Sequence, residues 1–291
     1  MLLPTLELTR RGRVLEVRIA NPDGDLLDAS VMADLDLLGR RLADDASIGA
    51  VILTGPRPGT FVPHYDIEEI VAGAQDFSVP TSYPVARGAL AAVKVAAIIP
   101  GAWRALSNSP AAGLVQMLRT QMALRRLGLL PQVVIAAIDG DALGGGCELA
   151  LACDIRVMTD ADYRIGLPEI SAGIMPGAGG TQRLAAAVGA RRARAMVLQA
   201  RTVDPREALH YGLVDEICDD AVVRAHEIAV RVAQWNPDAV RNAKRALPGW
   251  RGFTTEAAGF VATVSHRPAI EKMQEFVAQP RSPWQSRAWT S

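Results

Sequence analysis

Short apolar runs alternate with amphipathic stretches along this chain. The runs at 50–55 and 133–138 are almost wholly apolar and short, which is typical of buried strands. Between residues 30 and 42 the apolar positions recur at helical spacing: Val31, Leu35, Leu38 and Leu42. Asp28 lies where the cap of this helix is expected. This alternation of strand, helix and strand predicts an α/β fold with a mainly parallel sheet.

The two ends of the chain have different patterns. Residues 6–19 predict two short strands around Gly12, followed by a turn at 21–24. The second half predicts a series of helices with clear start and stop signals, at 190–200, from Asp204 and Pro205 to Gly212, at 220–234, at 236–246, and at 255–279 with an interruption at Pro268.

Two glycine-rich corners lie in the middle of the chain. The strand at 133–138 is followed by Gly144, Gly145 and Gly146 and then by a helical stretch at 147–152. Such a corner leaves the first N–H groups of the helix without partners and bare of side chains, which favours negative charge there. Glu148 lies in that first turn, and a second carboxylate, Glu169, precedes the next corner at 176–180.

Composition narrows the class of protein. The 291 residues are 49% hydrophobic, enough for one large core. Lys plus Arg and Asp plus Glu both number 31, so no overall field attracts nucleic acid or an anionic membrane, and a small-molecule partner is favoured. Three cysteines indicate no disulfide framework and favour the cytoplasm. We see neither a signal peptide nor an apolar run of ~20 residues, so no membrane association is expected.

The order and spacing of these motifs resemble the crotonase superfamily, best known for enoyl-CoA hydratases and isomerases. The resemblance rests on 142–150, 167–169 and 176–184, and it extends from about residue 7 to about 276. It implies an α/β, crotonase-like ββα superhelix. Residues 1–200 would form the spiral core and 201–291 a C-terminal helical region used for trimerisation, giving a homotrimer or a dimer of trimers.

The resemblance also implies a reaction and a set of site residues. Hydration of a trans-2-enoyl-CoA thioester would use Glu148 to handle the water, Glu169 to protonate the α-carbon and the Gly177 N–H to position the water. The N–H groups of Tyr65 and Gly145 would form the oxyanion hole. Six residues are expected to bind the acyl-CoA substrate: His64, Asp66, Ile67, Gly144, Leu167 and Pro168. No metal and no cofactor are expected, apart from coenzyme A as part of the substrate.

An acid role for Glu169 requires a raised pKa. Burial beside its apolar neighbours would supply it: Ile165, Ile170 and Ile174. Taken alone, Glu148 would be a helix-terminal charge and Glu169 a solvated loop carboxylate. Together, in these glycine contexts, they favour catalysis.

Other functions stay open beside hydration. Double-bond isomerases of the family typically keep only the Glu169-type carboxylate, so the presence of Glu148 favours hydration. A non-catalytic acyl-CoA-binding or scaffold protein is a further alternative, against which the two carboxylates count. The chain has neither a dinucleotide-binding nor a P-loop motif. Cys147 is interpreted as a small buried residue rather than as a nucleophile, because no His partner is identifiable.

Two segments depart from the family pattern. His64 and Tyr65 replace small residues in the oxyanion loop at 60–67, and we expect the Tyr65 side chain to shape acyl access. The segment at about 73–130 is longer than the family needs and predicts an extended helical insertion over the acyl end of the pocket. Its apolar stripe could pack in the core or line that pocket: Leu114, Met117, Leu118, Met122 and Leu127.

Overall fold

A six-stranded sheet forms the centre of the molecule. The computed structural model describes residues 3–75, 81–96, 99, 101–109, 111–246, 260–261, 264–265 and 267–278. The strand order is β1-β2-β3-β4-β6-β9, with β1 and β2 antiparallel and the later pairs parallel. The strands are β1 (Leu6–Arg11), β2 (Val14–Ile19), β3 (Ala50–Thr54), β4 (Val133–Ile138), β6 (Ile155–Thr159) and β9 (Glu216–Cys218). The predicted hairpin and the two apolar strands are therefore confirmed.

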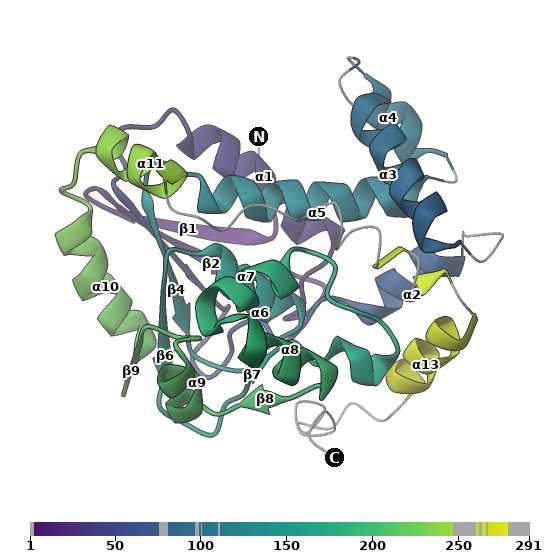
Figure 1. Cartoon of the computed structure of the whole chain (residues 1–291). Helices are drawn as coiled ribbons and strands as arrows, with labels where there is room; N and C mark the ends of the chain where they lie inside the picture. The colour runs from purple at the N-terminus through teal and green to yellow at the C-terminus, as the bar shows by residue number, and fades with distance from the viewer. Residues whose placement is uncertain are drawn as a thin grey trace.

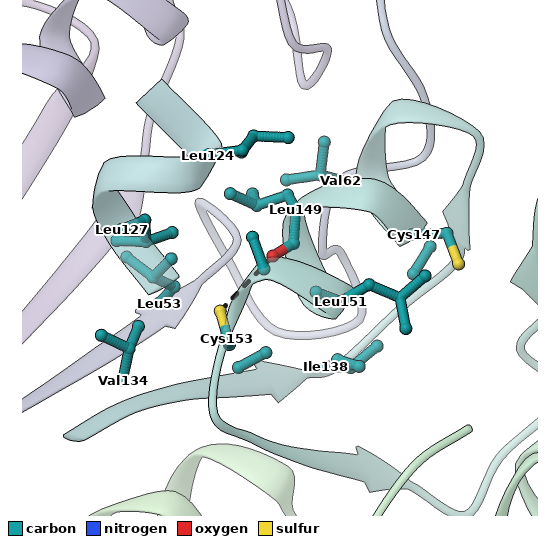
Figure 2. Close-up of a cluster of buried hydrophobic side chains, with 14 of the residues drawn as sticks. Leu53, Val62, Leu124, Leu127, Val134, Ile138, Cys147, Leu149, Leu151 and Cys153 are labelled. Atoms are coloured by element: carbon teal, nitrogen blue, oxygen red, sulfur yellow. Dashed lines mark hydrogen bonds between the residues drawn. The ribbon is translucent and has the colours of Figure 1, made fainter. Parts of the chain in front are cut away.

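Helices cover both faces of this sheet (Figure 1). On one face lies α10 (Ala221–Val232), whose apolar side packs on β3, β4 and β6. On the other face lie α1 (Ala29–Leu42), α5 (Ala112–Gly128) and α6 (Gly145–Ala152). Figure 2 shows how α5 and α6 meet the strands: Leu124, Leu127, Leu149 and Leu151 surround Leu53, Val134 and Ile138. Burial of β3 and β4 on both faces explains why these two strands are almost wholly apolar.

A small second sheet adjoins the first glycine corner. Its strands are β5 (Ala142–Leu143), β7 (Ile165–Gly166) and β8 (Thr202–Val203), in the order β5-β7-β8. The helical elements around it are the 3-10 turn η1 (Glu169–Ala172), α7 (Gly180–Val188), α8 (Ala190–Leu198) and α9 (Pro205–Tyr211). Buried residues of β7, α7, α8, β8 and α9 extend the core on this side of the molecule.

The expected helix caps are present. Asp28 accepts a hydrogen bond from Val31 N at 2.8 Å, and Asp220 accepts from Val222 N and Val223 N. In α9, Asp204 is the cap, Pro205 is the first residue, and Gly212 ends the helix in the left-handed conformation.

The long segment after the oxyanion loop is helical, as predicted. It comprises the end of α2 (Ile67–Gln75), then α3 (Tyr83–Ala96), α4 (Ala102–Ser107) and α5. In Figure 1, α3 and α4 stand beside the N-terminal end of α5 and above α2. Apolar residues of α3 and α5 form a cluster of their own with Val261.

One residue of the predicted stripe on α5 is not buried. Leu114, Met117, Leu118 and Leu127 are at most 7% exposed, but Met122 is 40% exposed. The expectation was wrong for Met122 because it borders a hollow next to α1 instead of a packed helix.

Part of the C-terminal region packs on the main sheet. Strand β9 lies at the edge of this sheet and α10 covers one of its faces. The division near residue 200 stays a prediction. The remaining helices are α11 (Pro237–Ala246) and α13 (Arg267–Ala278), and α13 lies against α2. Pro268 stands in the first turn of α13, and 255–259 of the predicted last helix lie outside the described residues. No helix in the described ranges has the length and hydrophobicity to cross a membrane.

Candidate active site

The first glycine corner packs directly on the oxyanion loop. Gly144 has a φ of 49°, and Gly145 opens α6. A Cβ added at Gly146 would lie 1.8 Å from Val62 O, so no side chain fits there. The corner needs glycine for close backbone approach, and α6 therefore begins immediately beside the loop that carries Tyr65.

Glu148 joins the two glycine corners. Its side chain projects from the first turn of α6 and is only 4% exposed. Its Oε1 accepts hydrogen bonds from Ala178 N and Gly180 N, both at 2.8 Å. Backbone donors of the second corner thus hold the carboxylate of the first and fix its position.

Glu169 faces the same corner from η1. It is 8% exposed, and a Cβ built at Gly144 would lie 3.3 Å from its Oε1. Of the three isoleucines expected to bury it, Ile165 and Ile174 are buried, but Ile170 is 38% exposed. Ile170 was assigned to the wrong face because a 3-10 turn with three residues per turn rotates it away from the carboxylate.

The two predicted oxyanion donors are neighbours. Leu27 pairs with the loop as in a parallel ladder, through Leu27 N to His64 O at 3.1 Å and Asp66 N to Leu27 O at 2.7 Å. This pattern turns the N–H of Tyr65 away from Leu27. A Cβ built at Gly145 would lie 3.2 Å from Tyr65 N. Within the described part of the chain no acceptor engages the N–H of Tyr65 or Gly145. Their role as an oxyanion hole stays a prediction.

Both carboxylates and both donors border one cavity of about 470 Å³. Eight of the predicted site residues line it: His64, Tyr65, Ile67, Gly144, Gly145, Glu148, Glu169 and Gly177. The other three are not among its described lining residues. Asp66 accepts from Glu68 N at 2.8 Å at the start of α2, Leu167 is buried, and Pro168 precedes η1. Their substrate contacts stay a prediction.

The insertion supplies part of the cavity wall. Gly73 and Ala74 at the end of α2 and Gln116, Met117 and Thr120 of α5 border it. The helices therefore contribute to the cavity as well as to packing, so both interpretations of this segment hold for Met117.

A polar pair in the cavity was not expected from the sequence. The Tyr65 hydroxyl donates to Glu69 Oε1 at 2.7 Å, and Glu69 Oε2 accepts from Ala29 N at 2.9 Å. Burial raises the pKa of Glu69 although these hydrogen bonds oppose it. Burial, followed by the charge of Glu69, raises the pKa of Tyr65, so the phenol stays neutral. The spacing of four residues between the two could have indicated the pair.

Phe260 was also missed. It borders the cavity from a distant part of the sequence, and a Cβ built at Gly177 would lie 2.6 Å from its ring. Gly177 O accepts from Gln121 Nε2 of α5 at 2.8 Å. The predicted water-positioning residue is thus packed between two segments that the sequence does not connect to it.

Cys147 cannot act as a nucleophile here. It is completely buried, and burial, then the charges of Glu169 and Glu148, raise its thiol pKa well above the usual value. A neutral thiol is a poor nucleophile, so the side chain packs as a small apolar group. Figure 2 shows it at the edge of the core cluster around Leu151.

The geometry is suited to proton transfer next to a carbonyl group. Two carboxylates held in one cavity can move protons to and from a bound substrate. Two adjacent backbone N–H groups can stabilise negative charge that develops on a carbonyl oxygen. An otherwise mostly apolar lining suits an acyl chain.

Comparisons with known proteins agree with this chemistry. Residues 106–287 match the model of the family described as enoyl-CoA hydratase/isomerase. A short-chain-enoyl-CoA hydratase of Clostridium acetobutylicum is 33% identical over 251 residues, which are 85% of this chain and 82% of the relative. The solved structure of DspI from Pseudomonas aeruginosa is 30% identical, with a TM-score of 0.64 over 83% of this chain and 85% of that one. The solved structure of an enoyl-CoA hydratase from Bacillus anthracis is 26% identical, with a TM-score of 0.64 over 94% of this chain and 96% of that one. The chain therefore has the crotonase fold and belongs to the enoyl-CoA hydratase/isomerase family of the crotonase superfamily.

Proposed function

We propose that the protein adds water to a trans-2-enoyl-CoA thioester and forms a 3-hydroxyacyl-CoA. One observation supports this most strongly: Glu148 and Glu169, from separate segments, border one cavity beside two adjacent backbone donors. The family and the named hydratase among the relatives support the same reaction.

In this mechanism each group has one task. Glu148 takes a proton from water while the water oxygen bonds to C3 of the substrate. The electron pair of the double bond moves toward the thioester, and the N–H groups of Tyr65 and Gly145 stabilise the enolate oxygen. Glu169 then delivers a proton to C2, and the Gly177 N–H positions the water. The atoms of one water molecule are thus added across the double bond, and no metal or cofactor is needed.

Isomerisation of a double bond is the alternative within this family. It needs one carboxylate to carry a proton between two carbons, which Glu169 alone would satisfy. The buried position of Glu148, held by two backbone donors in the same cavity, favours hydration. A non-catalytic acyl-CoA-binding protein would have no use for two buried carboxylates, which are costly to desolvate.

Substitution of the two carboxylates distinguishes these functions. Glu148→Gln and Glu169→Gln should each lower hydration of a trans-2-enoyl-CoA by about 10²–10⁴-fold. The double variant should be little worse, because the two groups act on one transition state. Glu68→Gln, at an exposed position on α2, is the matched control.

Each alternative gives a different result in this experiment. Robust hydration by Glu148→Gln would overturn the proposal. Conversion of a 3-enoyl-CoA that only Glu169→Gln abolishes would identify an isomerase. Binding of acyl-CoA by all variants, without turnover by the wild type, would identify a binding protein.

The assembly and location are part of the same proposal. We infer a homotrimer or a dimer of trimers, in line with the family resemblance. Exposed apolar side chains near the C-terminal helices support an interface: Val223, Val230 and Trp235 are 54–61% exposed. We infer a cytoplasmic location, supported by three free thiols. Sedimentation equilibrium and cell fractionation would test these two points.

A further inference from the structure

A second cavity adjoins the first at Gln116. It has a volume of about 480 Å³ and lies between α1, α4 and α5. Its lining is partly apolar, with Met32, Ala33, Trp103 and Met122, and partly charged at its rim. Gln116 borders both cavities, so its side chain lies between the reaction cavity and this second space.

Three neighbouring side chains line the reaction cavity on this side. Tyr65 donates to Glu69 Oε1, and Gln116 lies close enough to the Tyr65 hydroxyl to oppose the rise in its pKa. Glu69 is anchored in turn by the N–H of Ala29, which borders the second cavity. The three side chains come from the oxyanion loop, α2 and α5, and one of them, Gln116, borders both cavities. We call these three side chains the Tyr65–Glu69–Gln116 wall.

The wall is well suited to limit chain length. Tyr65 lies on the loop that carries the predicted oxyanion donor, so its ring occupies a fixed place relative to the thioester. The hydrogen bond from its hydroxyl to Glu69 holds the ring against rotation, since breaking it inside the protein would leave polar groups without partners. Gln116 and Glu69 are themselves held by helices. An acyl chain that extends to this point would meet these three side chains.

We propose that the Tyr65–Glu69–Gln116 wall is the length-determining end of the acyl site, and that opening it lets the distal methylene groups of a longer acyl chain enter the second cavity. This inference rests on the proposed function for the identity of the ligand. Continuity through Gln116 and the apolar side chains of Met32, Trp103 and Met122 support this occupant. Burial of two methylene groups corresponds to roughly tenfold in affinity, which sets the size of the expected effect.

The test is a chain-length series measured in two ways. Dissociation constants for saturated acyl-CoAs from butanoyl to hexadecanoyl would be determined by calorimetry, and kcat/KM would be measured for the matching trans-2-enoyl-CoAs. We expect Tyr65→Ala to raise affinity for dodecanoyl-CoA relative to butanoyl-CoA by at least roughly tenfold over the wild type. Gln116→Ala should shift the series in the same direction. Tyr65→Phe keeps the ring but loses the hydroxyl, and should give a smaller shift.

A variant in the second cavity identifies where the chain goes. Met122→Trp should have no effect on chain length by itself, because the wall is closed. Combined with Tyr65→Ala, it should cancel the gain for the long chain. A gain that survives Met122→Trp would overturn the assignment to the second cavity, and an unchanged series in both Tyr65→Ala and Gln116→Ala would overturn the wall.

The two proposals fail separately. If the wild type hydrates no enoyl-CoA but the dissociation constants shift as expected, the wall stands and the hydratase function does not. If the wild type hydrates enoyl-CoA but the variants leave the chain-length series unchanged, the hydratase function stands and the wall does not. Circular dichroism would establish that each variant is folded. If Tyr65→Ala does not fold, Tyr65→Phe and Gln116→Ala still test the wall.

Discussion

At the scale of single residues, Gly180 packs tightly against the carboxylate of Glu148. A Cβ there would lie 2.8 Å from both Cγ and Oε1 of Glu148 and 3.0 Å from Leu167. Since Gly180 N also donates to that carboxylate, an added methyl group should displace Glu148 from its two backbone donors. The position therefore needs glycine for the geometry of its neighbour.

We predict that Gly180→Ala lowers hydration by about 10²-fold or more, because the displaced carboxylate loses its place in proton transfer. Steady-state kinetics with a trans-2-enoyl-CoA would measure the effect. Gly88→Ala is the matched control, since nothing lies within 4 Å of a Cβ at this exposed position on α3. The explanation is wrong if both variants keep wild-type kcat.

Tyr65 combines a backbone and a side-chain function at one position. The backbone N–H is predicted to stabilise the enolate, and the ring belongs to the wall of the cavity. We predict that Tyr65→Pro, which removes the N–H, costs roughly 10²–10³ in kcat. Tyr65→Ala keeps the N–H and should change chain-length preference more than the maximal rate. Equal losses of kcat in the two variants would show that the two functions are not separate.

At the scale of secondary structure, a buried carboxylate links two helices. Glu69 of α2 accepts from Ala29 N at the start of α1, and Asp28 and Asp66 add negative charge around it. Its pKa is raised, with burial as the main cause. A carboxyl group whose folded pKa exceeds its unfolded value, about 4.3, contributes stability below the unfolded pKa, and that contribution is lost as the pH rises through the folded pKa.

We therefore predict that the wild type loses stability relative to Glu69→Gln as the pH rises above about 4.3 and through the folded pKa. The measurement is urea unfolding at a series of pH values, with the difference in free energy of unfolding plotted against pH. Taking the difference removes the titration of other groups and the constant cost of the changed hydrogen bonds. A difference that stays flat, or that favours the wild type with rising pH, would contradict the raised pKa.

Local sequence signals predicted the helices and strands well, but they did not predict contacts between residues far apart in the sequence. Asp28, Asp204 and Asp220 begin helices because a cap acts on residues two or three positions away. The glycine corners were likewise readable, since a missing Cβ is a local property. The exposure of Met122 depends on whether α1 or a cavity lies opposite it. The contact of Phe260 with Gly177 joins residues more than 80 positions apart in the sequence.

At the scale of the whole molecule, a largely buried ion pair links helix α11 to the main sheet. Lys244 Nζ lies 2.5 Å from Asp154 Oδ2 and donates to Gln132 O at 2.6 Å. Asp154 also accepts from Val134 N of β4 at 2.7 Å. The sequence predicted α11 and β4 but not this link, because nothing local connects residue 154 to residue 244. The link joins the C-terminal helices to the same sheet that supports the active-site loops.

We predict that Lys244→Met destabilises the fold by about 3 kcal/mol, since it leaves a largely desolvated carboxylate without its partner. Asp154→Asn in the same chain removes that charge and should recover part of the loss, giving a positive coupling in a double-mutant cycle. Urea denaturation of the four proteins would measure both quantities. Arg206, whose ion pair with Asp160 is 79% exposed on the arginine side, provides a matched control: Arg206→Met should cost less than about 1 kcal/mol. Equal effects of Lys244→Met and Arg206→Met would show that the buried link does not hold α11 to the sheet.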